Sequence, residues 1–172
     1  TPSVEMVYPR DHQIWQPLLP PVAITPQLED LHRPEHFAGV TQVVARLIDL
    51  CQPQRLLLGE KDYQQLRVII EMVKQESTRW PDLVVEGHPT IRDPDGLAMS
   101  SRNQLLTTSE RTRALGLVSA LQAASAADTA IEAESRMTQI LLEHGLDIDY
   151  AVVRDATTLQ PITSQQQPSR AL

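Results

Sequence analysis

RLLLGEKDYQQLRVIIEMV, residues 55–73, joins a strand pattern to a helix pattern and so predicts an α/β fold. In RLLLG, residues 55–59, the apolar run at 56–58 ends in Gly59 and is typical of a short strand that is buried on both faces. Apolar residues then recur at i, i+3, i+4 and i+7, which predicts an amphipathic helix. They are Leu66, Ile69, Ile70 and Val73. A strand that leads through a glycine into a helix is typical of parallel α/β units.

The neighbouring segments extend this pattern in both directions. Upstream, apolar residues from Val43 to Cys51 recur at helical intervals, and Pro53 prevents the helix from continuing. Downstream, LVVEG at 83–87 predicts a second strand. The proline-rich stretch 14–34 predicts extended or looped chain, because proline disrupts helix interiors. Ligands of such sheets gather at the carboxyl ends of the strands.

Residues 104–172 have a different character and predict a small α+β domain. TTSE at 107–110 is a capping-box pattern, which predicts the start of a helix that runs to about Ala124. A second helix is expected to stop at Gly145, and the alternation in DIDYAVV at 147–153 predicts a strand. The polar tail after it predicts no regular element. We therefore expect two domains, with the boundary after residue 103.

Composition limits the classes of function. A net charge of -7 and a pI near 5.1 disfavour a nucleic-acid surface, which needs clustered basic residues. No stretch has the length of a membrane span, and residues 1–11 lack a signal-peptide pattern, so a cytoplasmic protein is expected. The single cysteine, Cys51, excludes an internal disulfide and is expected to be buried. The absence of an initiator Met predicts an internal fragment.

Three polar residues follow the first predicted strand. Lys61 comes where the dipole of the next helix is already positive, which is locally unfavourable unless an anion binds there. A solvated surface lysine explains it equally well. Asp62 is either a helix N-cap or an acceptor for ligand hydroxyls, and Gln65 is either a ligand contact or part of an exposed face.

RDPDGLAMSSRN, residues 92–103, predicts a turn followed by a polar loop. Pro94 and Gly96 fit the second and fourth positions of a β-turn. Hydroxyl and guanidinium donors then follow one another, a combination suited to phosphate oxygens, although an ordinary polar loop would look the same. They belong to Ser100, Ser101 and Arg102. We expect this loop and Lys61 to face one crevice.

His32 and His36 stand at a metal-ligand spacing, but no metal site is predicted. Pro34 between them is incompatible with a regular helix, and no third ligand lies nearby in the sequence.

Two long stretches in this order resemble pantothenate synthetases (pantoate–beta-alanine ligases), an ATP-dependent, AMP-forming family of the nucleotidyltransferase superfamily. They are RPEHFAGVTQVVARLIDLCQPQRLLLGEKDYQQLRVI and PTIRDPDGLAMSSRNQLLTTSER. The resemblance covers residues 1–160 and includes PSVEMVYP near the start. It implies that residues 1–103 are the C-terminal half of a Rossmann-like nucleotide-binding domain and that residues 104–172 are a small α+β domain, itself truncated.

The resemblance also implies a two-step reaction, in which pantoate and ATP give pantoyl adenylate, and beta-alanine then displaces AMP. It implies phosphate binding by Lys61, Ser100, Ser101 and Arg102, with Mg²⁺ sharing the charge. It places Gly59, Asp62, Ile91 and Met99 at the nucleotide, with Asp62 on the ribose. It places Gln65, Val43, Val44, Arg33 and His36 at pantoate and beta-alanine.

Two departures from the family pattern set the alternatives. Glu35 stands where the family has a glycine, which is expected to alter the local turn or to add negative charge. The family's His-x-Gly-His motif is absent from these residues, so the chain alone is expected to be inactive. The alternative is a catalytically incomplete fragment or degenerate homologue that binds nucleotide or a partner subunit. A homodimer and a fusion to cytidylate kinase are further implications of the resemblance.

Overall fold

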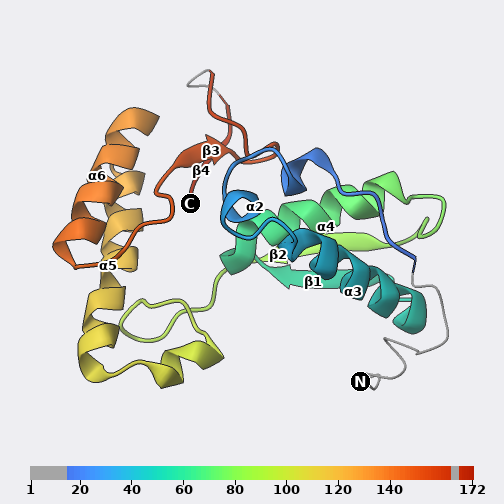
Figure 1. Cartoon of the computed structure of the whole chain (residues 1–172), viewed down its shortest axis with the longest axis horizontal. Coiled ribbons are helices and arrows are strands. Elements are labelled where there is room, and N and C mark those ends of the chain that lie inside the picture. The colour runs from blue at the N-terminus through green and yellow to red at the C-terminus, as the bar shows by residue number, and fades with distance from the viewer. Residues whose placement is uncertain (1–14, 164–166) are drawn as a thin grey trace. The chain divides into compact units, whose positions relative to one another are not determined.

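The computed structural model describes residues 15–163 and 167–172, which form two compact units (Figure 1). Within the described residues, unit 1 ends at Pro89 and unit 2 begins at Thr90. The opening segment 1–14, on which part of the resemblance rests, lies outside the described residues. Among the described residues, no helix combines the length and the hydropathy that a membrane crossing needs.

Unit 1 contains a parallel two-stranded sheet with its helices, which confirms the predicted α/β class. β1 pairs in parallel with β2, with Leu56 opposite Val85 and Leu58 opposite Gly87. The strands are connected through α4, as in a βαβ unit. The elements of unit 1 are η1 (Pro21–Ala23), α2 (Glu29–His32), α3 (His36–Cys51), β1 (Arg55–Gly59), η2 (Glu60–Asp62), α4 (Tyr63–Gln75) and β2 (Val84–His88).

The core of unit 1 lies on one face of this sheet. Leu56 and Leu58 of β1 pack with Val85 of β2 against buried residues of α3 and α4. The other face is open, because Leu57 is 55% exposed and Val84 is 51% exposed. The prediction that β1 is buried on both faces is therefore wrong for the described residues, since α3 and α4 cover only the face that carries Leu56 and Leu58.

The predicted burial of Cys51 is also wrong. Thr41, Ala45 and Ile48 form the buried face of α3, whereas Cys51 is its last residue and is exposed. Gln52 follows with φ 43° and turns the chain away from the helix. The apolar spacing predicted the helix correctly but not the point at which its buried stripe ends.

Unit 2 begins with a hairpin and continues with two packed helices (Figure 1). Arg92 and Ala98 bridge the hairpin, and the helices share a core that includes Ala120 and Met137. Gly116 permits close contact between the first of these helices and His144, the C-cap of the second, because an added Cβ would lie 2.7 Å from the Cβ of His144. The elements are η3 (Ser101–Leu105), α5 (Thr108–Ser125), α6 (Ala130–Glu143), β3 (Val153–Asp155) and β4 (Ser169–Ala171).

The N-terminus of α5 confirms the predicted capping box. The Glu110 N–H donates to Thr107 Oγ1 at 3.2 Å, and Thr107 N–H donates to Glu110 Oε2 at 2.8 Å. The Thr107 N–H and the Thr107 hydroxyl both donate to the Glu110 carboxylate, the hydroxyl at 2.7 Å, and these two bonds hold the pKa of Glu110 below its ordinary value.

The end of the chain differs from its prediction. Residues 147–152 form no strand, and β3 begins at Val153, where antiparallel pairing with β4 starts. The tail predicted to lack regular structure supplies β4.

The two units divide after Pro89, whereas the predicted domain boundary follows Asn103. The hairpin at 91–99 belongs with unit 2 because it is tied to α5, as the contacts of Arg111 show below.

Candidate functional site

Lys61 lies just beyond the carboxyl end of β1, in η2. Its Nζ contacts Asp62 Oδ1 at 3.1 Å, and the side chains are 38% and 63% exposed, respectively. Asp62 occupies the N-cap position of α4 but makes no side-chain capping hydrogen bond. The N-cap interpretation of Asp62 is therefore not realised, and its carboxylate faces Lys61 instead.

Gly59 ends β1 beside open space. Its φ of -72° is accessible to any residue, but no atom lies within 4 Å of an added Cβ. The backbone is thus open to close approach by another group, as the resemblance implies for Gly59.

Gln64, which the sequence analysis passed over, is the buried glutamine of the pair at 64–65. Its Nε2 donates to Val22 O and to Asp30 Oδ1, both at 3.0 Å, and its Oε1 accepts from the Glu29 N–H at 3.0 Å. Gln64 is 5% exposed, whereas Gln65 is half-buried. The missed signal is spacing, because Gln64 stands four residues before fully buried Val68 on the inner face of α4.

Apart from Gln65 of α4, the residues predicted at pantoate and beta-alanine lie in α3 and in the turn before it. Val43 and Val44 are half-buried in α3, and Val44 packs against the core of unit 1. Arg33 is exposed and pairs with Glu29 at 3.5 Å, and His36 opens α3 with its ring 5.0 Å from that of Phe37. Val44 thus contributes to the core, and its place at pantoate and beta-alanine stays a prediction.

Glu35 does not distort the turn before α3. Its φ of -94° and ψ of -3° are right-handed values that any residue adopts, and its side chain is exposed. The expected change in the local turn is therefore not observed.

The hairpin in unit 2 carries Ile91 and Met99 opposite each other. The Met99 N–H donates to Ile91 O at 2.9 Å, and the side chains of Met99 and Ile91 are 54% and 71% exposed, respectively. At the tip, the Gly96 N–H donates to Asp93 O at 2.8 Å, which is the predicted β-turn, and Gly96 has φ +89°. The turn requires this glycine, because other residues rarely adopt that φ.

Ser100 and Ser101 follow the hairpin and line a hollow of about 430 Å³. Ser100 Oγ accepts a hydrogen bond from the Arg102 N–H at 3.2 Å, and Ser101 begins η3. Arg102 is exposed and is not among the residues of the hollow. The lining residues are Asp93, Met99, Ser100, Ser101, Asn103, Gln104 and Arg111.

Arg111 of α5 binds both aspartates at the hairpin tip, a contact that the sequence analysis missed. Its Nε donates to Asp95 Oδ2 at 2.9 Å, and its Nη2 donates to Asp93 Oδ2 at 2.8 Å. The hydrogen bond from Arg111 holds the pKa of Asp95 below its ordinary value, and the bonds to Asp93 and Asp95 raise the pKa of Arg111. No local signal could have found this pairing, because the partners lie 16 and 18 residues apart.

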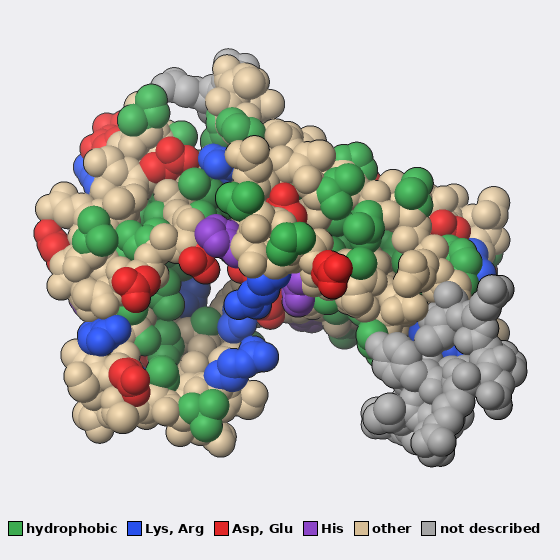
Figure 2. Space-filling model, in the orientation of Figure 1, with side chains coloured by type: hydrophobic (Ala, Val, Ile, Leu, Met, Phe, Trp, Pro, Cys, Tyr) green, Lys and Arg blue, Asp and Glu red, His purple; other side chains and the backbone are tan. Residues whose placement is uncertain are grey.

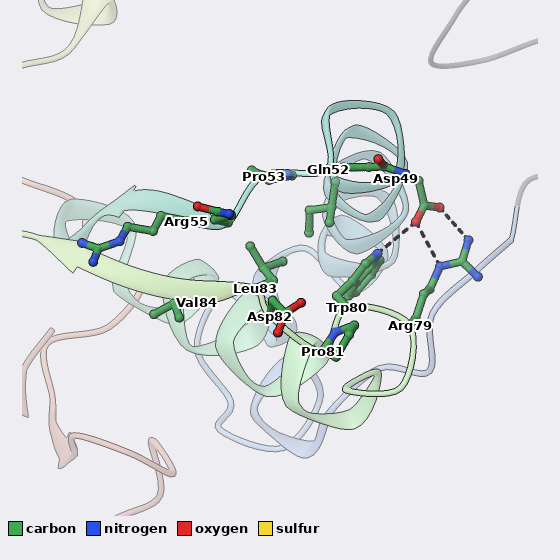
Figure 3. A pocket seen from close by; sticks show the side chains of 12 residues that line it. Asp49, Gln52, Pro53, Arg55, Arg79, Trp80, Pro81, Asp82, Leu83 and Val84 are labelled. Carbon is green, nitrogen blue, oxygen red and sulfur yellow. Dashed lines mark hydrogen bonds and ion pairs between the residues drawn. The ribbon is translucent and has the colours of Figure 1, made fainter.

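A second hollow, of about 640 Å³, lies in unit 1 at the end of the sheet where β1 and β2 begin (Figure 3). Arg55 and Val84, the first residues of β1 and β2, line it, so it lies away from Lys61. Arg79 and Trp80 both point to Asp49 there, at 2.6 and 2.9 Å. Burial acts to raise the pKa of Asp49, but these hydrogen bonds hold it below its ordinary value.

The described residues contain no group of three His, Cys, Asp or Glu side chains that could hold a metal ion. His32 and His36 belong to separate helices, α2 and α3. On the face shown in Figure 2, acidic and basic side chains are interspersed. Each unit does offer hydrogen-bond donors for anionic oxygens. Unit 1 has the ammonium of Lys61, and unit 2 has the hydroxyls of Ser100 and Ser101.

The whole chain, residues 1–172, matches the family model described as pantoate-beta-alanine ligase. It is 42% identical to a bifunctional pantoate ligase/cytidylate kinase of Synechococcus elongatus, over 99% of the chain and 33% of that protein. It is 41% identical to a pantothenate synthetase of Myxococcus xanthus, over 98% of the chain and 58% of that protein. The chain thus spans about a third of the bifunctional relatives and somewhat over half of the others.

Solved structures agree with these relatives. A pantothenate synthetase from Thermus thermophilus superposes with a TM-score of 0.88 at 36% identity, covering 99% of this chain and 62% of that one. A pantoate-beta-alanine ligase from Francisella tularensis, complexed with beta-gamma ATP and beta-alanine, superposes with a TM-score of 0.59 at 31% identity. It covers 79% of this chain and 50% of that one.

Proposed function

The chain belongs to the pantoate-beta-alanine ligase family, and from this premise we propose that it is part of an enzyme that joins pantoate to beta-alanine with ATP. The observation that carries the proposal is the match over all 172 residues, together with Lys61 exposed beyond the carboxyl end of β1. Ligands of parallel sheets bind at that end.

The proposed reaction has two displacements. A carboxylate oxygen of pantoate attacks the α-phosphorus of ATP, and pyrophosphate leaves. The amine of beta-alanine then attacks the acyl carbon of pantoyl adenylate, and AMP leaves while the nitrogen gives up its proton. No side chain forms a covalent bond in this scheme, so the protein contributes alignment and electrostatic stabilisation.

Lys61 is proposed to stabilise charge on the phosphate oxygens. Its ammonium has three donor hydrogens, and the contact with Asp62 at 3.1 Å accounts for one of them. Donors thus remain for a phosphate, while Asp62 keeps Lys61 oriented and offers its other oxygen to ribose hydroxyls. Gln65 is proposed to orient pantoate, from the first turn of α4.

Val43, Val44, Arg33 and His36 are proposed to lie at pantoate and beta-alanine. Ser100, Ser101 and Arg102 are proposed to donate to triphosphate oxygens, with Ile91 and Met99 beside the adenine. Supporting this, Ser100 and Ser101 line one hollow with Met99.

Mg²⁺ is proposed to enter with the nucleotide. Phosphate oxygens of the nucleotide and water molecules would coordinate it, because Mg²⁺ prefers oxygen ligands and retains several waters. When bound, the ion supplies additional positive charge for the departing pyrophosphate. The cytoplasmic location and the homodimer both stay predictions.

The open face of the sheet supports the proposal that these residues act as part of a larger fold. Parallel sheets are normally covered on both faces, yet Leu57 and Val84 are about half exposed. We propose that further polypeptide of the family's nucleotide-binding domain covers this face.

The test is AMP formation by the full-length protein with ATP, Mg²⁺, pantoate and beta-alanine. Lys61→Ala should lower kcat/KM by roughly 10²–10³-fold, because it removes charge stabilisation from the transition state. Lys74→Ala is the matched control, since Lys74 is an exposed lysine of α4 that pairs with Glu71.

The outcomes separate the alternatives. Activity that survives Lys61→Ala unchanged would remove Lys61 from the site. A full-length protein that binds ATP without forming AMP would instead support the alternative, a degenerate homologue that binds nucleotide.

A further inference from the structure

Backbone contacts between its two sides connect the tip of the hairpin to the end that carries Ile91 and Met99. Besides the Arg92–Ala98 bridge, the Asp93 N–H donates to Leu97 O at 2.8 Å, and Leu97 is 5% exposed. A displacement of the tip therefore displaces the Ile91 and Met99 end as well.

Arg111 fixes this tip from outside the hairpin. Its guanidinium contacts two carboxylates of the turn, at 2.8 Å to Asp93 and 2.9 Å to Asp95. A planar fork that bonds two carboxylates restrains both position and orientation, which a single ammonium does not. Asn103 adds a tether nearby, because its Nδ2 donates to Ala98 O at 3.0 Å.

Arg111 also balances charge beside the hollow. Arg111 and Asp93 both line it, together with the hydroxyl-bearing Ser100 and Ser101. Without the guanidinium, two carboxylates would stand near the oxygens of any bound phosphate and repel them. The same side chain thus tethers the hairpin and cancels unfavourable charge.

We propose that Arg111 is a positioning residue for ATP, holding the Ile91–Met99 hairpin in place and neutralising Asp93 and Asp95 beside the hollow. The inference rests on the proposed function, because it deepens the role of that hairpin. It assigns Arg111 no contact with the reacting atoms.

The experiment measures steady-state kinetics of AMP formation by the full-length protein, with each substrate varied in turn. Arg111→Ala should lower kcat/KM for ATP roughly 10–100-fold, mainly through KM, because a small misplacement of binding groups has effects of this size. The KM values for pantoate and beta-alanine should stay within about twofold of wild type, because the proposal links Arg111 to ATP alone. A general loss of folded protein would instead lower kcat without changing the KM of one substrate selectively.

Two further variants make the test specific. Arg111→Lys retains the charge but not the fork, so its KM for ATP should lie between those of wild type and Arg111→Ala. Arg113→Ala, an exposed arginine two residues further along α5, should leave all three KM values unchanged. If Arg111→Ala does not fold, Arg111→Gln retains a polar side chain without the charge or the fork and should still raise the KM for ATP selectively, by a similar factor.

Equal changes in all three KM values, or an unchanged KM for ATP in folded Arg111→Ala or Arg111→Gln, would overturn the inference. Both results leave the proposed function standing, because wild type forms AMP in each. Wild-type protein that forms no AMP would remove the proposed function itself, together with the inference that rests on it.

Discussion

Unit 1 holds its proline-rich segment with a buried neutral amide, whereas unit 2 holds its hairpin with a partly exposed guanidinium. Gln64 connects α4 to Val22, Glu29 and Asp30 through three hydrogen bonds of 3.0 Å. Arg111 connects α5 to two carboxylates, and its own side chain is 34% exposed. Each connection fixes a segment that carries or leads to residues predicted to bind substrate.

The difference separates stability from function. A buried polar group left without its partner pays the full desolvation penalty, so the amide of Gln64 should matter greatly for folding. Exposed ion pairs contribute little to stability because water already solvates the charges. Arg111 should therefore matter more for where the hairpin lies than for whether unit 2 folds.

Gln64→Ala should give the largest loss of stability. It removes the hydrogen bonds of Gln64 to Val22 O, to the Glu29 N–H and to Asp30 Oδ1, so we expect a loss of roughly 3 kcal/mol in the free energy of unfolding. Urea denaturation followed by circular dichroism measures it. Gln65→Ala is the matched control and should change stability by less than about 0.5 kcal/mol. Equal losses in both variants would contradict the assignment of the structural role to Gln64.

Gly116→Ala and Gly39→Ala should change stability in opposite directions. At Gly116 the added Cβ would lie 2.7 Å from His144 Cβ, an atom close to the backbone that cannot easily move. Overpacking costs about 1–3 kcal/mol and outweighs the helix-propensity gain of about 1 kcal/mol. At Gly39 of α3 no atom lies within 4 Å, so the gain should remain. Thermal unfolding of both variants tests this, and stabilisation by Gly116→Ala would refute the α5–α6 packing.

Asp95→Asn should have the smallest effect on stability, and that effect should depend on pH. The pKa of Asp95 is lowered from its ordinary 3.8 by the hydrogen bond from Arg111, so the folded state binds this proton less readily than the unfolded state. Its stabilisation is present above pH 3.8 and is lost as pH falls through the lowered pKa. The Tm difference between wild type and Asp95→Asn should therefore vanish in acid. A difference that grows as pH falls would show that the ion pair does not stabilise the fold.

Local patterns predicted the elements that local interactions determine. The stretch 55–73 predicted β1 and α4, and TTSE predicted the N-terminus of α5, because spacing and capping act within a few residues. Burial depends on distant partners, which explains why Leu57 and Cys51 were misjudged. DIDYAVV alternates like a strand, but pairing starts only where β4 lies alongside.

The candidate site was predicted through the resemblance more than through the residues. Lys61 and the hydroxyls of Ser100 and Ser101 could be singled out because donors adjoin a strand end or a turn. Gln64 and Arg111 bear no such mark, since a glutamine in a QQ pair and an arginine in ERTR both have the appearance of a solvated helix face. Their partners lie 34 or more and 16 or more residues away, so folding alone brings them together.

The end of α3 offers a handle for chemical labelling. The 172 residues contain one cysteine, Cys51, and its thiol is exposed. A maleimide dye would therefore attach at one place within them. β1 lies between Cys51 and Lys61 in the chain, and the label would sit towards the Arg55 end of that strand, away from Lys61. Fluorescence from this position would follow unit 1 while every residue predicted to bind substrate stays unmodified.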